Sequence, residues 1–369
     1  MRQIAVCLGL LAVCSLPLLA YGSSVSDPLD QPASQTQTAA SKVLMGVAKA
    51  GDRLVAVGER GIIVLSDDHG KTWRQAAVPT SVTLTAVDFP VPNQGWVVGH
   101  SGVVLHTSDS GETWTRQLDG KAAAQLMLAA AQARANRGAA TNAVEQKQLA
   151  QAQRFVEEGA DKPFLDVHFE NELVGFVVGA FGLIFRTDDG GKSWQDWTDR
   201  VDDPHGFHLY SIKSNGRTIY LAGEQGLFLR STDAGNSFKR IETPYRGSYF
   251  TAALTPSGAI LLAGMRGNAY RSTDQGKSFT KVDVPIAVSF SDALLLKNGN
   301  LLFVNQAGNL LESRDDGRTM HVVATPPMPP VAAITQAEDD MFVTVGVAGA
   351  IPIQVGQSSA PAMKAGGPQ

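Results

Sequence analysis

Six aspartates recur at one place in a repeated pattern, and carboxylates in such numbers could bind calcium or act as acid–base catalysts. Each follows a Gly or Asn by ten residues and precedes a Gly by two and a large apolar residue by five. The six sets are Gly58/Asp68/Gly70/Trp73, Gly99/Asp109/Gly111/Trp114, Gly179/Asp189/Gly191/Trp194, Gly223/Asp233/Gly235/Phe238, Gly264/Asp274/Gly276/Phe279 and Asn305/Asp315/Gly317/Met320. Catalytic carboxylates must converge on one substrate, whereas these belong to six separate copies of a unit. We therefore expect them to be structural.

A turn of the form Ser/Thr-x-Asp-x-Gly-x-Thr/Ser-aromatic accounts for the pattern without catalysis. The carboxylate can accept hydrogen bonds from backbone N–H groups of its own turn, and the Gly tolerates a conformation that a Cβ would penalise. The aromatic residue that follows should fold back onto its own unit, where burial of the ring contributes about 2–3 kcal/mol.

Outside the repeats, the residues that could do chemistry are scattered. Five carboxylates could be proposed for the acid pair of a glycosidase: Asp88, Asp166, Glu170, Glu224 and Asp292. The sequence gives no way to pair them. His205 and His208 lie close in sequence but have no third ligand, so we expect no metal site. No nucleophile elbow and no phosphate-binding Gly loop occurs, and we expect neither a cofactor nor an enzyme.

Arginine forms the one constellation that could bind a partner. Arg186, Arg230 and Arg271 stand at the same position, just before the Asp-containing turn, in three consecutive units. If the units form a ring, these side chains share one sector, with Arg246 and Arg266 nearby. Such a strip could dock an acidic partner segment through bidentate pairs. Alternatively, each Arg lies along its own unit and pairs with a neighbouring carboxylate. The sequence leaves both open.

The spacing of the units predicts the fold, an all-β, seven-bladed β-propeller. The first unit contains four short strand patterns joined by turn sequences, at residues 44–48, 53–57, 62–65 and 73–78. The anchoring Gly or Asn residues, Gly346 included, follow one another at steps of 41, 80, 44, 41, 41 and 41 residues. Seven anchors give seven blades if the step of 80 is one period plus an insertion of about 39 residues.

The insertion, about residues 120–160, has a helical composition. Residues 121–136 are rich in Ala, Gln, Leu and Met, Arg137 and Gly138 interrupt the pattern, and residues 142–158 resume it. Asn142 and Glu145 have the spacing of a capping box at the start of the second helix. We predict a helical hairpin between blades 2 and 3.

The propeller is expected to span residues 42–355, with a disordered tail over 356–369. The seventh unit has Gly346 and Gly349 but neither Asp nor an aromatic residue at the later offsets, so it supplies three strands. An exposed edge strand is a template for aggregation. We therefore expect residues just before Val43, at the end of a linker over 23–41, to supply the closing strand.

Residues 1–22 are typical of a cleaved export signal, with Arg2, an apolar run over residues 4–20 and a small-x-small site at Ala20-Tyr21-Gly22. The run is short for the alternative, a transmembrane anchor. We expect an exported protein, periplasmic or extracellular and monomeric. Cys7 and Cys14 lie inside the signal, so the mature chain has no thiol. A net charge of −4 argues against a nucleic-acid partner.

The repeated turn is the Asp box, or bacterial neuraminidase repeat, preceded here by a Gly-x-x-Gly-apolar-apolar-x-Arg-Ser/Thr lead-in. Residues 178–194, 222–238 and 263–279 carry both parts. With them the chain, over residues 43–353 apart from the insertion, resembles the photosystem II stability/assembly factor family of seven-bladed propellers. The insertion, and Met320 in place of an aromatic residue, depart from the photosynthetic members.

In photosynthetic organisms the resemblance implies a lumenal factor that binds the nascent photosystem II reaction centre. In other bacteria it implies an exported propeller, often linked to membrane transporters. We expect a non-catalytic binding platform that helps to assemble or stabilise a membrane protein complex or binds its exported segment. The alternatives are an accessory protein of a membrane transporter and a carbohydrate-active hydrolase, because sialidases also carry the Asp box.

Overall fold

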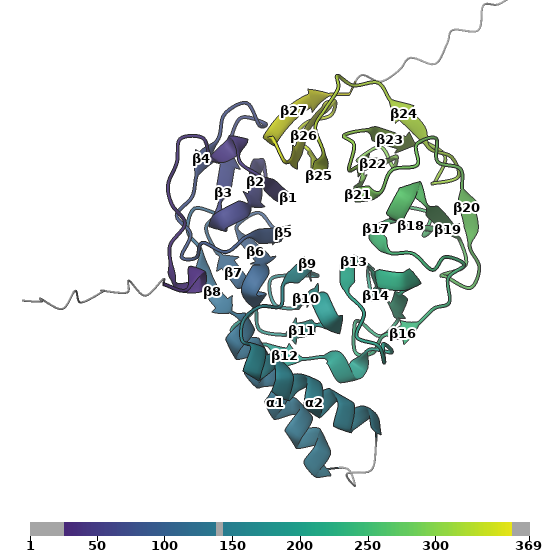
Figure 1. The fold of residues 1–369 in the computed structure, drawn as a ribbon. Helices are drawn as coiled ribbons and strands as arrows, with labels where there is room; N and C mark the ends of the chain where they lie inside the picture. Colours follow the sequence, from purple (N-terminus) through teal and green to yellow (C-terminus); the bar gives the residue numbers. More distant parts are fainter. Residues whose placement is uncertain (1–25, 138–142, 356–369) are drawn as a thin grey trace, which may run out of the picture.

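The computed structural model describes residues 26–137 and 143–355, which form seven antiparallel sheets arranged as a ring (Figure 1). Six sheets have four strands and the seventh has three, and in every sheet neighbouring strands are consecutive in the chain. The predicted seven-bladed β-propeller is therefore confirmed. The expected export signal over 1–22 and tail over 356–369 lie outside the described residues.

Each blade runs from an innermost strand at the ring axis to an outer strand at the rim. The innermost strands are β1 (Leu44–Ala50), β5 (Leu84–Val91), β9 (Phe164–Phe169), β13 (Leu209–Asn215), β17 (Tyr249–Leu254), β21 (Phe290–Leu295) and β25 (Val331–Gln336). The second strands are β2 (Arg53–Gly58), β6 (Gln94–Gly99), β10 (Gly175–Gly179), β14 (Thr218–Gly223), β18 (Ile260–Gly264), β22 (Leu301–Asn305) and β26 (Met341–Gly346). The third strands are β3 (Ile63–Ser66), β7 (Val104–Thr107), β11 (Ile184–Thr187), β15 (Phe228–Ser231), β19 (Ala269–Ser272), β23 (Leu310–Ser313) and β27 (Gly349–Gln354). The outer strands are β4 (Arg74–Gln75), β8 (Thr115–Leu118), β12 (Gln195–Asp196), β16 (Lys239–Arg240), β20 (Thr280–Val282) and β24 (His321–Val323).

The ring has two different faces because the strands are antiparallel. The Asp boxes join third to outer strands on one face, here called the Asp-box face. The turns between second and third strands lie on the opposite face together with the connections from one blade to the next, and we call it the Gly-turn face. In five blades this turn is a short 3₁₀ helix: η3 (Glu59–Gly61), η4 (His100–Gly102), η5 (Ala180–Gly182), η7 (Glu224–Gly226) and η8 (Met265–Gly267).

Two constraints require a Gly at the second Gly position of the turn between the second and third strands. Gly226 has φ +77, and a Cβ added to it would lie 2.1 Å from the carbonyl oxygen of Tyr245 in the connection to the next blade. Gly61 has φ +74 and approaches the Thr80 carbonyl in the same way. The Gly therefore permits both the left-handed turn and the close passage of the chain over it.

The predicted closing strand before Val43 is not formed. Residues 26–43 contain two 3₁₀ helices, η1 (Pro28–Asp30) and η2 (Ala39–Ser41), and no strand, and the sheet of blade 7 contains only β25, β26 and β27. The chain ends do meet, but through a loop. The Ala40 carbonyl lies over Gly349, where an added Cβ would be 2.0 Å from its oxygen, so these residues replace the blade-to-blade connection.

A proline weakens the open edge of β27 as a partner for another strand. The Val355 N–H donates to the Asp340 carbonyl on the side of β26. Because the direction of the backbone groups alternates along a strand, the nitrogen of Pro352 faces outward, where it has no hydrogen to donate. This is the physical reason why blade 7 does not need the strand that the sequence led us to expect.

Residues 26–41, expected to be a linker, pack along blades 1 and 2 and, at Ala39 and Ala40, on blade 7. The Leu29 side chain is buried in the core shared by these blades. Arg116 donates to the Leu29 carbonyl at 2.8 Å, and the Ala33 N–H donates to Val78 at 3.0 Å. Burial of Leu29 and these backbone bonds hold the segment in place.

The insertion forms the predicted hairpin of α1 (Gly120–Arg137) and α2 (Ala143–Glu158), which projects outward between blades 2 and 3 (Figure 1). The Asp119 carboxylate accepts from the N–H groups of Lys121 and Ala122 at 3.0 Å and so caps α1. Met127 of α1 and Phe155 of α2 belong to one hydrophobic core with blade 3. Asn142, expected to cap α2, lies outside the described residues. Among the described helices, none has the length and apolar character to cross a membrane.

Gly226→Ala is expected to destabilise the protein by about 3 kcal/mol, because a left-handed alanine costs about 1–2 kcal/mol and the contact with Tyr245 adds a further penalty. Gly216→Ala is the matched control, since Gly216 also has positive φ but an added Cβ would meet nothing within 4 Å. Urea unfolding followed by circular dichroism would measure both. Equal losses in the two variants would contradict the role given to the close passage.

Candidate functional site

The six Asp-box carboxylates are occupied by their own turns. Asp233 accepts the Ser237 N–H at 3.0 Å, the Ser237 hydroxyl at 2.8 Å and the Ser231 hydroxyl at 2.6 Å. Ser231 in turn accepts the Gly235 N–H at 2.8 Å. The same bonds are made by Asp68, Asp109, Asp189, Asp274 and Asp315. Across the described residues, no group of three or more His, Cys, Asp or Glu side chains could hold a metal ion.

These hydrogen bonds favour the ionised carboxylate. Partial burial by itself would raise the pKa of Asp233, but the bonds from Ser231 and Ser237 outweigh it and lower the pKa to about 2. For Asp68 the Thr72 hydroxyl has the largest effect, and its pKa is also about 2. Anionic acceptors with such low pKa values serve turn geometry and are poor proton donors at neutral pH.

The three arginines of the strip donate hydrogen bonds from one blade to the next. The Arg186 guanidinium donates to Asp188 and to the Ala234 carbonyl in the next Asp box, the latter at 3.4 Å. Arg230 donates to the Gln275 carbonyl, and Arg271 to the Asp316 carbonyl at 2.6 Å and to the Asp316 carboxylate. Arg186 and Arg271 pair with a carboxylate, as the local-pairing alternative describes, whereas Arg230 donates to a backbone carbonyl, and docking of a partner by the strip stays a prediction. Each acceptor carbonyl belongs to the residue that precedes the Gly of the box.

Two further pairs of neighbouring blades are joined by the same kind of hydrogen bond to an Asp-box carbonyl. Their donors are residues that the sequence did not indicate. Arg53 donates to the Ser110 carbonyl at 3.2 Å, and Gln117 to the Gly190 carbonyl at 2.9 Å. Every accepting residue in the five junctions has positive φ: Ser110, Gly190, Ala234, Gln275 and Asp316. We call these five bonds the blade latches. Three donors stand at one repeated position in the third strands β11, β15 and β19, whereas Arg53 is in β2 and Gln117 is in β8.

Arg246 and Arg266 do not lie near this strip, and the expectation that they would is wrong. Arg266 is in η8 on the Gly-turn face, and Arg246 is in the connection that leads into β17 on the same face. Arg271 lies at the other end of the short strand β19. Both residues are exposed, and in the part of the chain that is described neither forms an ion pair.

Three of the five scattered carboxylates meet at the ring axis. Asp88, Asp166 and Asp292 come from three innermost strands and act on Lys213 of β13, a residue that the sequence analysis did not single out. Burial lowers the pKa of Lys213, but the three carboxylates more than compensate and the pKa is raised. Asp166, Asp292 and Lys213 line a channel cavity of about 170 Å³. Lys213 is the one charged residue of β13, and this was the available signal.

Each of these carboxylates also accepts a hydrogen bond from a backbone N–H group in the innermost strand of the next blade. Asp88 accepts the Phe169 N–H at 2.7 Å, Asp166 the Ile212 N–H at 2.9 Å and Asp292 the Ile334 N–H at 3.1 Å. The other oxygens of Asp166 and Asp292 accept the N–H of the residue that follows each of them. Burial raises the pKa values of Asp88 and Asp292. The cluster therefore joins blades around the axis.

The remaining chemical candidates are dispersed. Glu170 follows β9 in a turn on the Asp-box face, and Glu224 lies in η7 on the opposite face. The Glu224 carboxylate is 3.1 Å from Nδ1 of His208, whereas the His205 ring stacks on Phe207. The two histidines thus have separate partners.

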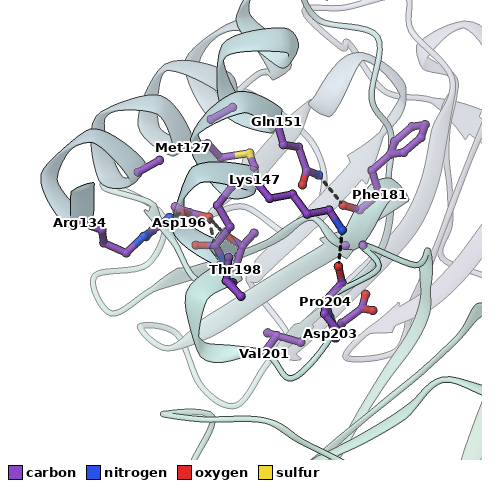
Figure 2. A pocket seen from close by; sticks show the side chains of 16 residues that line it. Met127, Arg134, Lys147, Gln151, Phe181, Asp196, Thr198, Val201, Asp203 and Pro204 are labelled. Atoms are coloured by element: carbon purple, nitrogen blue, oxygen red, sulfur yellow. Dashed lines mark hydrogen bonds and ion pairs between the residues drawn. The ribbon is translucent and has the colours of Figure 1, made fainter. Parts of the chain in front are cut away.

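A small cavity of about 60 Å³ separates the helical hairpin from blades 3 and 4 (Figure 2). Lys147 of α2 donates to the Pro204 carbonyl at 2.5 Å, and Gln151 to the Phe181 carbonyl at 3.3 Å. Arg134 of α1 pairs at 3.3 Å with Asp196, whose side chain is 1 % exposed. The space suits a few water molecules. We interpret it as the seam that fastens the hairpin.

The Gly-turn face carries a wider hollow, of about 350 Å³, where blades 5, 6, 7 and 1 meet. Its lining is largely apolar and includes Met45, Phe250, Phe290, Val331 and Val347. This volume lies in the range of pockets that bind small ligands or single side chains. No pattern in the sequence indicates this hollow, because its residues come from five strands, two turns and the segments that precede β1 and β25.

The sequence profile of a family described as "Photosynthesis system II assembly factor YCF48" matches residues 30–149 and 144–325. The photosystem II assembly lipoprotein Ycf48 of Synechococcus sp. (strain CC9902) is 39 % identical over 100 residues, which are 26 % of this chain and 30 % of the relative. The relative from Synechococcus sp. (strain RCC307) is 40 % identical over 58 residues, or 16 % and 18 % of the two chains. The matches thus span less than a third of these relatives.

Solved structures share the fold at low sequence identity. One described as "YCF48 bound to D1 peptide" superposes with a TM-score of 0.61 at 15 % identity, over 90 % of this chain and 98 % of the other. YCF48 from Cyanidioschyzon merolae gives 0.59 at 14 %, over 86 % and 96 %. A GH74 enzyme from Niastella koreensis gives 0.58 at 13 %, over 87 % and 53 %.

Acid should weaken the fold through the Asp boxes. Because the pKa of Asp233 is about 2 in the folded protein, below the ordinary value of an aspartate, its contribution to stability is present above about pH 4 and is lost as the pH falls towards 2. Asp233→Asn should lower stability at pH 7 by about 1–2 kcal/mol and reduce the loss on acidification. Thermal melting between pH 7 and pH 2 measures both effects. Asp52→Asn is the control, because within the described residues Asp52 makes no side-chain hydrogen bond.

Removal of a blade latch should destabilise the ring even though the arginine lies at the surface. Arg271→Ala is expected to cost about 2 kcal/mol, since its side chain is 13 % exposed and Asp316 would lose its partner. Arg217→Ala, an exposed residue of the Asp-box face, should change stability by less than about 0.5 kcal/mol. Chemical denaturation compares them, and equal stabilities would refute the latch.

Proposed function

This chain belongs to the family described as photosynthesis system II assembly factor YCF48, and from that premise we propose that it is a non-catalytic platform for an exported segment of a membrane protein. Binding of that segment would assist the assembly or stability of the complex to which the membrane protein belongs. D1 is the first candidate, because a structure with this fold is described as YCF48 bound to a D1 peptide.

The observation that carries the proposal is the extent of the family match. It covers residues 30–149 and 144–325, which include the six Asp-box blades and the helical hairpin. We further propose that the protein acts on the exported side of a membrane, supported by the export signal expected over residues 1–22 and by relatives that are named lipoproteins. Exported loops and termini of membrane proteins would then be within its reach.

The chemistry of the described residues supports a binding role over catalysis. The carboxylates that converge, Asp88, Asp166 and Asp292, accept backbone N–H groups and interact electrostatically with Lys213. A glycosidase needs one carboxylic acid and one carboxylate that both face the scissile bond in an open cleft. Groups that are already bonded to the edges of neighbouring strands serve closure of the ring instead.

Binding to tiled D1 peptides tests the proposal. Overlapping, fluorescein-labelled peptides that cover the exported segments of D1 from Synechococcus would be titrated with the full chain, and anisotropy would report the dissociation constant. We expect at least one tile to bind in the micromolar range and its scrambled version not to bind. Failure of every tile would contradict the D1 assignment, and turnover of a glycan panel by the same preparation would contradict the non-catalytic role.

A further inference from the structure

The innermost strands carry a β-bulge at the same place in every blade, where they line the channel. In each of them the register with the second strand shifts between the first and the third residue, as between Leu209 and Ser211 in β13. A bulge changes the direction of the side chains beside it and is common next to binding sites. The second and third residues of all these strands, together with Val47, Val87 and Lys213, line the channel cavity of about 170 Å³. The bulges therefore shape one cavity on the ring axis.

The third residues give this cavity a small side and a polar side. Blades 7, 1 and 2 contribute only Gly or Ala at this position, which leaves room on the axis. Blades 3 to 6 contribute the polar residues Asp166, Ser211, Thr251 and Asp292. Lys213, two residues further along β13 than Ser211, adds an ammonium group. A cavity lined by a few convergent polar groups and both signs of charge is suited to a small polar ligand.

Three polar groups of the lining have no hydrogen-bond partner in the part of the chain that is described. Ser211 is 3 % exposed, and its hydroxyl is buried without a hydrogen bond. Thr251 is 2 % exposed, and its hydroxyl forms no hydrogen bond to a described residue. The Lys213 ammonium interacts electrostatically with Asp166 and Asp292 but forms neither a hydrogen bond nor an ion pair within the described ranges. Because buried polar groups are normally hydrogen-bonded, these donors indicate an occupant of the cavity.

The two carboxylates of the lining can accept further hydrogen bonds. Each oxygen of Asp166 and Asp292 accepts one backbone N–H group, and a carboxylate oxygen has two lone pairs. These two anionic groups line the same space as the Lys213 ammonium without touching it. An anion alone would be repelled by the aspartates, and a cation alone would leave the Lys213 donors unbonded. The occupant should therefore carry one group of each charge.

The cavity adjoins the apolar hollow of the Gly-turn face. Met45, Phe250, Ser291 and Ala332 line both spaces. Because the innermost strands begin on the Gly-turn face, the order along the axis is the hollow, the ring of third residues and then Lys213. A ligand that fills both spaces would have an apolar part in the hollow and its charged groups in the cavity.

We propose that the axis cavity binds a free α-amino acid with an apolar side chain, such as leucine. Its ammonium lies between Asp166 and Asp292, its carboxylate accepts from Lys213, and its side chain enters the hollow beside Met45 and Phe250. The two unbonded hydroxyls of the ring bond to the same charged groups. The inference goes beyond the proposed function and does not rest on it, because the site takes a small molecule and needs no protein segment.

Calorimetric titration of the full chain, dialysed into an amine-free buffer, tests the chemistry with four compounds. L-leucine should bind with a dissociation constant below about 1 mM. The other three each lack one feature: 4-methylpentanoate has no ammonium, 3-methylbutylamine has no carboxylate and glycine has no apolar side chain. Each should bind at least about tenfold more weakly, since each loses one set of contacts. Absence of L-leucine binding at about 10 mM, or equal affinity for one of the three analogues, would overturn the proposal.

Variants locate the site. Thr251→Val and Ser211→Ala remove hydroxyls that have no partner in the described protein, so they should fold normally and bind L-leucine about fivefold or more weakly. Thr335→Val is the matched control, because Thr335 is also buried in an innermost strand, β25, but does not line the cavity. Lys213→Met should abolish binding, with circular dichroism and melting temperature as the measure of folding. Equal affinities of the Thr251→Val and Thr335→Val variants would place L-leucine elsewhere and refute the site.

The outcomes separate this inference from the proposed function. If D1 tiles bind and L-leucine does not, the platform role stands, and the amino-acid site falls in favour of a cavity filled by water. If L-leucine binds with the expected dependence on its charged groups and no D1 tile binds, the axis site stands and the D1 assignment fails.

Discussion

The ring depends on one backbone carbonyl in five of the six Asp boxes, that of the residue held in a left-handed conformation before the Gly. The Asp carboxylate fixes the turn from within, and that conformation presents the carbonyl to the preceding blade. A guanidinium or an amide from the preceding blade then donates to it, as Arg271 does to Asp316. A local turn motif thus becomes the contact between blades, and its repetition closes most of the circle. The low pKa of Asp233, about 2, is a measure of how strongly the turn prefers the charged form.

Because the blade latches lie on the Asp-box face, the side chains of the opposite face are available to bind a partner. On the Gly-turn face the connection between two blades packs its backbone directly on a Gly, as the Tyr245 carbonyl does on Gly226. This contact between blades involves no side chain of the turn. The turn apexes are therefore free to carry Arg60, Phe181 or Arg266, which face solvent. Because the side chains of the Asp boxes join the blades, they are similar in every box, whereas the residues at the apexes of the Gly-turn face can differ from blade to blade.

The sequence predicted the parts of the structure that repeat. Steps of 41 residues and the shared offsets of Asp, Gly and aromatic residues required one unit copied around a ring, and the break in period located the helical hairpin. The sequence could not show whether Arg186 docks a partner or forms a latch. Its acceptor is the backbone carbonyl of Ala234 in the next blade, and a backbone acceptor cannot be identified from residue type because every residue has a carbonyl. Nor could it pair Asp166 with Asp292, since the two meet only after the ring closes around Lys213.

The closure between blades 7 and 1 is where the repetition fails, and the hollow is a consequence of that failure. In blade 1 five residues separate the paired positions Val57 and Ile63, whereas in blade 7 only two separate the paired Gly346 and Gly349. Blade 7 also lacks an Asp box, and the His69–Glu338 pair at 3.0 Å stands at this junction in place of a latch. The hollow lies beside this shorter turn, and Val331 and Phe290, which are both buried, form part of its wall. The irregular blade that closes the ring thereby borders the hollow with the exposed side chain of Val347.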